Sequence, residues 1–364
     1  ANFLNLGIGP ATVYHLSRRD FSTRAAVRGN IRLALVITFV GTVLSLPVLI
    51  LWGDTLFPGI PKALLFIGLV CFPIMLFLAL LSTVLQGLED FRAFNASVLL
   101  PPLTTLIGVS IALYLFEVGV YGALAAFILG QLAALMAVSL FLRNHLTRDD
   151  ASERGKSADK ASSYNQRVLS YGWKAYLSNV ITFINYRADI FLVNFFLSPA
   201  ATGIYVIAVQ ISEKLWMPSQ AVSTVLFPRL SAMKDQPAER LKLTKKGFAL
   251  VALITAITSA VAAVVLYWLI GPIFGEEYLE ALPAFLWLIP GVVLWAGARV
   301  QANCIAAAGK PEWNMYVSLC VLIINVVGNV ILIPKFGIVG AAWATSSAYV
   351  FDALVKYFLV KCTI

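Results

Sequence analysis

The sequence predicts an all-α integral membrane protein, and three of its properties support this fold class. Of the 364 residues, 60% are apolar and only 12% are charged, and the mean hydropathy is +0.85. Soluble domains are about 45–50% apolar and about 25% charged, so the composition excludes a cytosolic enzyme and a secreted soluble domain. The apolar residues also form long unbroken stretches rather than alternating segments of about ten residues, which excludes a β-barrel.

Ten stretches are long and apolar enough to cross a hydrocarbon layer of about 30 Å as helices. They cover residues 33–52, 63–86, 96–116, 118–142, 175–197, 203–227, 247–270, 281–306, 315–333 and 338–360. An eleventh stretch, 1–17, has the character of the end of one more helix. Several stretches contain proline, at Pro101 and Pro102, at Pro218 and at Pro290. We expect kinks there, because proline removes a hydrogen bond from the helix.

The positive charges predict which loops face the cytoplasm. Alternate loops hold almost all of the Lys and Arg, chiefly in residues 18–32, 143–174 and 229–246, whereas the opposite loops hold only Lys62 and Lys335. Cytoplasmic loops carry such an excess of Lys and Arg, so we expect the basic loops on one common side. The net charge of +9 is therefore interpreted as a topology signal rather than as a nucleic-acid surface.

Two segments with related patterns predict an internal repeat. Residues 94–142 align with 313–360 so that Gly119 meets Gly337, and each glycine opens a G-x-x-G-A motif. Parallel repeats of six helices are a known transporter arrangement, with the substrate site between the halves. We therefore expect two parallel six-helix bundle repeats, with the first helix and part of the second missing from this sequence. The N-terminal half bundle would cover 1–142, a flexible cytoplasmic linker 143–173 and the C-terminal half bundle 174–364.

Ionisable residues inside the predicted spans are candidate functional groups, because each costs about 2.5–3.5 kcal/mol to insert. All of them lie in the second half: Arg187, Asp189, Glu213, Lys214, Arg299, Asp352 and Lys356. On 175–197 one helical face is polar through the middle of the membrane, and we expect it to line a water-filled cavity. That face carries Ser178, Asn179, Thr182, Asn185, Tyr186 and Asp189.

The other charged positions leave two interpretations open. Gln210 and Glu213 share a face of 203–227 beside Lys214, so these groups form a cavity wall or an acid and a base that neutralise each other. Arg187 and Arg299 similarly bind a ligand or serve the structure, Arg299 by extending toward the membrane surface. Asp352 and Lys356 are four residues apart, so we expect a mutual ion pair. Asn325 and Asn329 are expected to form hydrogen bonds between helices.

The four cysteines and two histidines do not have the spacing of a disulfide framework or a metal site. We therefore expect no metal and no cofactor, and we keep coupling to H⁺ or Na⁺ open. A membrane enzyme acting on a polyprenyl diphosphate would need a carboxylate cluster or a large loop at one face. Neither is evident in the sequence, so we do not expect an enzyme.

Four segments in the same order resemble the polysaccharide biosynthesis and export family. They are Asp189 with the following turn and Gly203-Ile-Tyr, then 227–230 (FPRL), 333–337 (IPKFG) and 340–342 (GAA). The family includes flippases for O-antigen and exopolysaccharide repeat units. It lies within the superfamily that holds the lipid II flippases and the multidrug and toxin extrusion transporters. The resemblance covers nearly the whole chain and implies two bundles around a central cavity lined by the first, second, seventh and eighth helices.

The resemblance also implies a function. The protein would move undecaprenyl-diphosphate-linked oligosaccharide repeat units from the cytoplasmic to the outer leaflet of the bacterial inner membrane. Candidate substrate-binding residues are Asn179, Tyr186, Arg187, Gln210, Lys214 and Arg299, and candidate ion-coupling residues are Asp189 and Glu213. Expected partners are the lipid-linked oligosaccharide and membrane lipids, with a polysaccharide polymerase and a chain-length regulator as further candidates, and no nucleic acid. The alternatives are a cation-coupled multidrug exporter and a lipid II flippase.

Overall fold

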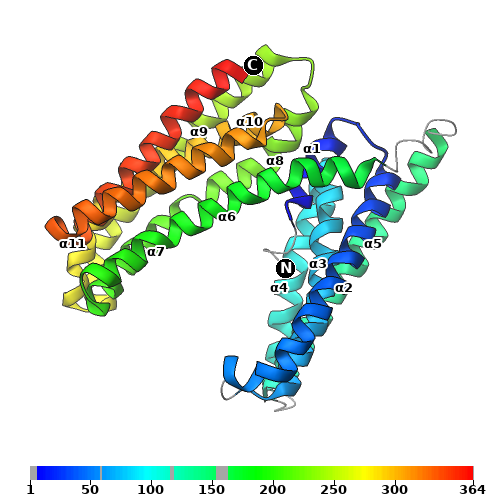
Figure 1. Ribbon diagram of the computed structural model, residues 1–364, viewed down its shortest axis with the longest axis horizontal. Coiled ribbons are helices and arrows are strands. Elements are labelled where there is room, and N and C mark those ends of the chain that lie inside the picture. The colour runs from blue at the N-terminus through cyan, green and yellow to red at the C-terminus, as the bar shows by residue number, and fades with distance from the viewer. Residues whose placement is uncertain (1–5, 58–59, 115–118, 153–162, 364) are drawn as a thin grey trace. The chain divides into compact units, whose positions relative to one another are not determined.

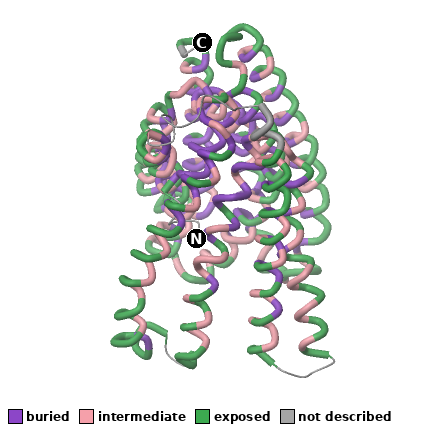
Figure 2. Tube along the Cα trace, turned by 90° about the vertical axis from the view of Figure 1, so that its right-hand side faces the viewer, coloured by how far each residue is buried: buried purple, intermediate pink, exposed green. Residues whose placement is uncertain are grey.

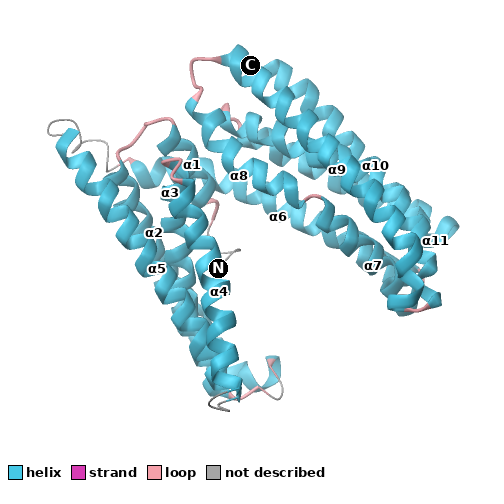
Figure 3. Ribbon diagram, turned by 180° about the vertical axis from the view of Figure 1, so that it is seen from behind, coloured by secondary structure: helices cyan, strands magenta, loops and turns pink. Residues whose placement is uncertain are grey.

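The computed structural model describes residues 6–57, 60–114, 119–152 and 163–363. Within these ranges the chain contains helices and no strand, which confirms the predicted fold class (Figure 1, Figure 3). The chain divides into two units, Ala1–Trp173 and Lys174–Ile364. The boundary falls inside one continuous helix, α6 (Tyr164–Phe196), whose first residues belong to the first unit.

The first unit consists of α1 (Ile8–Ser17), α2 (Thr23–Leu56), α3 (Lys62–Gly87), α4 (Phe91–Tyr114), α5 (Gly119–Ser152) and the start of α6. The described parts of the four spans predicted between 33 and 142 fall within α2 to α5, and residues 115, 116 and 118 of these spans lie outside the described residues. α2 begins where the sequence supplies a cap, because the Ser22 hydroxyl accepts a hydrogen bond from the Ala25 N–H at 3.3 Å. The side chains of α1 are largely buried among the other helices of this unit.

The second unit holds the rest of α6, followed by α7 (Pro199–Leu215), α8 (Met217–Ala232) and α9 (Pro237–Phe274). A short 3₁₀ segment, η1 (Glu276–Glu280), leads into α10 (Ala281–Ala307), and α11 (Pro311–Thr363) ends the unit. α10 is the central helix, packed against α7, α8, α9 and α11. The helices at this centre therefore come from segments that are far apart in the sequence.

Two of the predicted spans become one element, and another is divided. Residues 315–333 and 338–360 both lie in α11, but the backbone leaves helical geometry at Gly337, where φ is 60° and ψ is −141°. Glycine adopts this conformation without the penalty that a side chain would add. The span 203–227 is broken at Trp216, just before Pro218, into α7 and α8. The kink predicted at Pro218 is thus a break, whereas α4 and α10 continue as helices through Pro101, Pro102 and Pro290.

Seven helices of the described residues are long and apolar enough to cross a membrane: α2, α3, α4, α5, α9, α10 with η1, and α11. The count differs from the predicted ten because α11 contains two predicted spans, α7 and α8 are short, and α6 is too polar. Along the helices, buried positions alternate with exposed ones (Figure 2). Large apolar side chains such as Phe39 and Val264 are more than half exposed. Exposed apolar surface of this extent indicates contact with lipid, so the chain is a multi-pass membrane protein.

The two segments of the predicted repeat form similar helical hairpins, one in each unit. Gly119 and Gly337 both have positive φ, 62° and 60°, and each begins the second helix of a hairpin. In the first hairpin a Cβ added to Gly108 would lie 2.8 Å from the Cβ of Ala126, and in the second Gly328 would lie 3.0 Å from that of Ala344. Small residues allow such close helix crossings in membranes. The two hairpins thus share a glycine with positive φ at the start of the second helix and a close helix crossing.

The basic loops of the first unit meet at one end, as the charge asymmetry predicts. The Ser17 hydroxyl donates to the Gly87 carbonyl at 3.1 Å, which joins the α1–α2 turn to the α3–α4 turn. Phe21 packs edge-on against Tyr164, with ring centroids 5.1 Å apart, which brings the start of α6 to the same end.

The flexible linker expected over 143–173 differs from the structure at both ends, because α5 continues to Ser152 and α6 begins at Tyr164. Residues 153–162 lie outside the described residues.

Asp90 ties the start of α4 to the end of α5 at this basic end. Its carboxylate accepts the Ala93 N–H at 3.1 Å and contacts Nε2 of His145 at 2.9 Å. Burial raises the pKa of Asp90, but the hydrogen bonds from His145 and Ala93 outweigh burial, so the pKa lies below its ordinary value.

We expect Asp90→Asn to lower the stability of the first unit at neutral pH. Because the folded-state pKa is depressed, the stabilisation by the carboxylate is present above the ordinary pKa of about 3.9 and is lost as the pH falls below it. Melting temperatures of the parent and the variant in detergent, measured between neutral and acid pH, should therefore converge under acid conditions. Asp235→Asn, which alters an exposed carboxylate before α9, is the control. A gap between parent and Asp90→Asn that does not change with pH would contradict this role.

Candidate functional site

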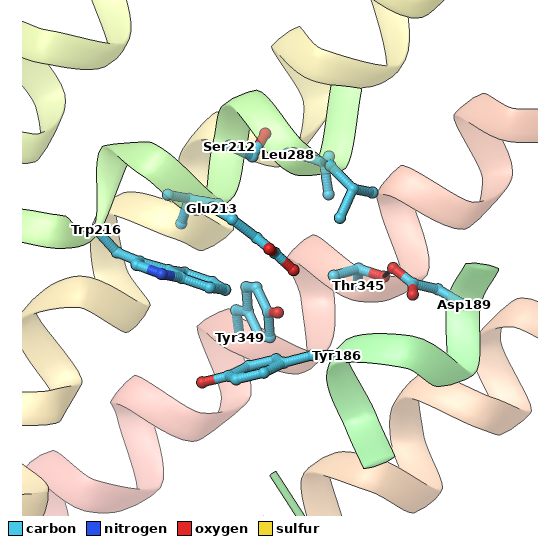
Figure 4. Close-up of a pocket in the computed structure, with 10 residues that line it drawn as sticks. Tyr186, Asp189, Ser212, Glu213, Trp216, Leu288, Thr345 and Tyr349 are labelled. Atoms are coloured by element: carbon cyan, nitrogen blue, oxygen red, sulfur yellow. Dashed lines mark hydrogen bonds between the residues drawn. The ribbon is translucent and has the colours of Figure 1, made fainter. Parts of the chain in front are cut away.

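A small pocket in the second unit brings together side chains of α6, α7, α10 and α11. Its water-accessible volume is about 20 Å³, enough for one water molecule. Figure 4 shows Tyr186, Trp216 and Tyr349 gathered beside Glu213, with Asp189 beside Thr345. The lining residues are Tyr186, Asp189, Val209, Ser212, Glu213, Trp216, Leu288, Val292, Thr345 and Tyr349.

Asp189 is held by hydrogen-bond donors rather than by a cation. Its side chain is 2% exposed and accepts the Tyr205 hydroxyl at 2.8 Å and the Thr345 hydroxyl at 3.2 Å. The Ile190 N–H donates to its other oxygen at 2.8 Å. Among the described residues, no basic side chain lies within 4.0 Å of these oxygens. The site can therefore accept a proton or a small cation without first displacing a basic partner.

The hydrogen bonds continue from Asp189 into both halves of α11. Nδ2 of Asn325 donates to the Thr345 hydroxyl at 3.3 Å, and Nδ2 of Asn329 donates to the Asn325 carbonyl at 2.9 Å. All of these side chains are buried. The predicted role of Asn325 as a bridge between helices is confirmed, because Thr345 lies beyond the break at Gly337. We call Asp189, Tyr205, Thr345, Asn325 and Asn329 the Asp189 network.

The residues of the predicted polar face of α6 differ in their surroundings: Ser178 and Asn185 are buried, Asn179 is exposed, and Tyr186 and Asp189 line the small pocket. The Ser178 and Thr182 hydroxyls each lie 3.2 Å from the Ser318 hydroxyl of α11. Asn185 is also buried, and Asp189 contacts Thr345. Ser178, Thr182 and Asp189 of α6 are thus matched by hydroxyl groups of α11, and the pattern of α6 alone does not reveal partners supplied by another helix.

The charged residues on α6 and α7 form one ion pair between the helices. Arg187 Nη1 lies 3.1 Å from Oε1 of Glu213, with side chains 42% and 22% exposed. Glu213 is therefore neutralised by Arg187 rather than by the adjacent Lys214, whose side chain is exposed. This pairing supports the structural interpretation of Arg187, and the exposed part of its side chain is open to a ligand.

Four aromatic side chains, Tyr186, Trp216, Trp295 and Tyr349, form a cluster at the site, and all of them except Trp295 line the pocket. The ring centroids of Trp216 and Trp295 are 4.4 Å apart, and Tyr186 lies 5.1 Å from Trp216. The Arg299 guanidinium is stacked over Trp295 at 5.0 Å, a cation–π contact. The charged end of Arg299 is therefore held at the cluster.

The structure brings together Tyr186, Arg187, Asp189, Glu213 and Arg299 of the predicted site residues. It places the side chains of Asn179, Gln210 and Lys214 on exposed surface instead. The sequence analysis did not identify Tyr205, Trp216, Trp295, Thr345 and Tyr349 as site residues. It selected mainly ionisable and amide residues inside the predicted spans, and these five are aromatic or hydroxyl residues. The spacing of Trp295 and Arg299, one helical turn apart, was the available clue to the cation–π contact.

Asp352 and Lys356 form the predicted ion pair, with Nζ of Lys356 2.7 Å from the carboxylate. Both side chains are buried, 2% and 7% exposed. No cluster of at least three His, Cys, Asp or Glu side chains suited to a metal occurs among the described residues.

Similar proteins are named as transporters and flippases. The chain is 22% identical over 291 residues to a Shigella flexneri protein named as an O-antigen transporter, which covers 80% of this chain and 68% of that protein. It is 23% identical over 207 residues to Agl15 of Haloferax volcanii, named as a low-salt glycan biosynthesis flippase, covering 56% of this chain and 44% of that protein. The chain thus spans only about half to two thirds of the length of these relatives.

Solved transporter structures share the fold. The MATE transporter ClbM, solved with Rb⁺, superposes with a TM-score of 0.80 at 17% identity, over 99% of this chain and 82% of that one. A MOP superfamily transporter from Pyrococcus furiosus gives a TM-score of 0.77 at 16% identity, over 99% and 84% of the two chains. These likenesses show a helical bundle fold with two repeats. The family model for polysaccharide biosynthesis proteins matches residues 89–283, over half of the sequence, and the chain belongs to this family.

Proposed function

We propose that the protein is a flippase that moves a lipid-linked oligosaccharide repeat unit, carried on undecaprenyl diphosphate, from the cytoplasmic to the outer leaflet of a bacterial inner membrane. The observation that carries this proposal is the family match over 89–283, which includes α6, α7 and the site residues Arg187, Asp189 and Glu213. Relatives named as an O-antigen transporter and a glycan biosynthesis flippase support it. The proposed activity is transport, so no catalytic residue is assigned.

Side chains at the site, together with exposed side chains of α6 and α7, suit both parts of such a substrate. We assign Arg187, Lys214 and Arg299 to the diphosphate, because guanidinium groups form paired hydrogen bonds with phosphate oxygens and Lys adds a point charge. We assign Asn179, Tyr186 and Gln210 to the sugar hydroxyls. Gln210 and Lys214 are exposed one turn apart on α7, so both are accessible on one helical face. A polymerase and a chain-length regulator are proposed partners, because polymer assembly must follow translocation of each unit.

We assign ion coupling to Asp189 and Glu213. Asp189 is buried, lacks a basic partner among the described residues and is linked by the Asp189 network to α7 and both halves of α11. A proton or Na⁺ bound there would change the hydrogen bonds that join these helices. Such a change can bias the two states of a transporter if the ion has different affinity for them.

A cation-coupled multidrug exporter is the second candidate. It is favoured by the two carboxylates and the aromatic rings of the pocket, which suit an organic cation. The Arg187–Glu213 pair counts against it, because Glu213 is already neutralised. A lipid II flippase would use the same diphosphate chemistry and differ in the sugar carried.

Variants of Arg187 distinguish a role in substrate binding from a role in neutralising Glu213. We expect Arg187→Gln in the full-length protein to abolish the restored surface polysaccharide in a bacterial strain that lacks its own repeat-unit flippase. The double variant Arg187→Gln/Glu213→Gln removes both charges of the pair, so no unpaired carboxylate remains. If Arg187 contacts the diphosphate, the double variant stays inactive although it folds and inserts normally.

Full recovery of surface polysaccharide by the double variant would contradict the assignment of Arg187 to the substrate. Failure of the parent protein to restore polysaccharide, in a host making the matched repeat unit and carrying the inserted protein, would contradict the flippase proposal itself. Membrane fractions probed for the protein provide the control for expression.

A further inference from the structure

A second pocket lies in the second unit between α9, α10 and the end of α11, at the end that carries the basic loops. Its water-accessible volume is about 160 Å³, comparable to an apolar cavity of about 150 Å³ that accommodates a benzene molecule. It is lined by Leu241, Thr244, Lys245, Phe248, Gln301, Tyr357, Val360 and Lys361. None of these residues belongs to the site around Asp189, and the proposed transport function leaves this pocket without a role.

The residues that line this pocket include apolar side chains and two exposed lysines. Lys245 on α9 and Lys361 on α11 are both exposed, and Lys361 Nζ lies 4.5 Å from the Tyr357 ring centroid. Leu241, Phe248 and Val360 supply hydrocarbon surface. The pocket thus presents hydrocarbon and two positive charges to the same ligand.

The pocket lining includes one buried polar side chain, that of Gln301. Its side chain is only 4% exposed, and its Oε1 has no hydrogen-bond partner among the described residues. A buried carboxamide oxygen without a donor has a free-energy cost, because it has lost its hydrogen bonds to water. A ligand hydroxyl group that donates a hydrogen bond to Oε1 would remove this cost.

We propose that this pocket binds an anionic phospholipid of the surrounding bilayer whose headgroup carries hydroxyl groups, phosphatidylglycerol being the simplest. An acyl segment lies against Leu241, Phe248 and Val360, the phosphate lies between Lys245 and Lys361, and a headgroup hydroxyl donates to Gln301. The position fits this occupant, because basic pockets between membrane helices on the cytoplasmic side bind anionic headgroups. The inference does not depend on which substrate the protein transports.

Native mass spectrometry of the full-length protein, titrated with phosphatidylglycerol or phosphatidylcholine, tests the site. A Lys near an anionic membrane surface contributes about 1 kcal/mol, so Lys245→Ala/Lys361→Ala should weaken phosphatidylglycerol binding roughly 25-fold. Binding of phosphatidylcholine should not change. The matched control, Lys242→Ala/Lys246→Ala, removes the same charge from exposed positions of α9 that do not line the pocket.

Two further variants test the pocket without changing its charge. Leu241→Trp should fill the cavity and reduce phosphatidylglycerol binding, and Gln301→Leu should reduce preference for phosphatidylglycerol over phosphatidic acid, which lacks the headgroup hydroxyls. Melting temperatures show whether each variant is folded.

Equal weakening by the two lysine pairs would mean non-specific attraction and would overturn the proposal. Displacement of phosphatidylglycerol by a lower concentration of undecaprenyl phosphate would overturn it as well, since the pocket would then belong to the carrier lipid. Unchanged binding in a folded Leu241→Trp variant would place the lipid elsewhere.

Discussion

Lys356→Met is expected to destabilise the second unit by about 3–5 kcal/mol, the typical cost of breaking a buried ion pair by removing one partner. Asp352 is 2% exposed, and the Lys356 ammonium, 2.7 Å away, is its basic partner within ion-pair distance. Without Lys356, the carboxylate must stay charged in an apolar environment or take up a proton. Either outcome reduces the free energy of unfolding.

Equilibrium unfolding in detergent measures this loss, and two variants serve as controls. Asp352→Asn/Lys356→Met removes both charges and should recover most of the stability, because a buried ion pair can be replaced by neutral side chains at little net cost. Lys335→Met changes an exposed lysine and should alter stability by no more than about 0.5 kcal/mol. If Lys356→Met matched Lys335→Met, the ion pair would have no structural role.

Asp189→Asn is expected to weaken the response of transport to the coupling ion. Asparagine has nearly the same size, and its Oδ1 can still accept the hydroxyls of Tyr205 and Thr345, but it cannot take up a proton or hold Na⁺ by charge. Coupling between two sites typically corresponds to about 5–150-fold in affinity, and we expect the dependence of the flipping rate on pH or Na⁺ to fall by a factor in this range. Flipping rates in liposomes with imposed pH or Na⁺ gradients measure it.

Thr345→Val is the matched control for Asp189→Asn. It removes the hydroxyl that donates to Asp189 at 3.2 Å but leaves the carboxylate in place. The variant should lower the rate while keeping its ion dependence. Parental ion dependence in a folded Asp189→Asn protein would show that the Asp189 network is structural.

The sequence predicted the parts of the fold that depend on local composition. Spans such as 63–86 and 281–306 closely match α3 and α10, because a continuous apolar stretch is sufficient to define them. The ion pair of Asp352 and Lys356 was predictable for a related reason, since helical geometry alone places residues four apart together. Gly337 was singled out by its motif, and it is where α11 breaks.

The site was predicted less completely, because its contacts join distant segments. The Thr345 hydroxyl that reaches Asp189 is 156 residues away in sequence, and Trp216 and Trp295 meet from different helices. A polar face on α6 can be matched by a neighbouring helix or by water, and its sequence does not distinguish the two. Whether the polar face meets a helix or water depends on Ser318 and Thr345, and both lie in segments whose sequence is typical of membrane helices.

Transport by the purified full-length protein in liposomes tests the central claim most directly. Two cargoes are compared in the same vesicles: a fluorescent undecaprenyl-diphosphate oligosaccharide, followed by its protection from an external quencher, and a cationic dye of the kind that multidrug exporters move. We predict that the protein redistributes the lipid-linked oligosaccharide between leaflets and leaves the dye unmoved. Movement of the dye without movement of the lipid would contradict the flippase assignment and favour the multidrug exporter.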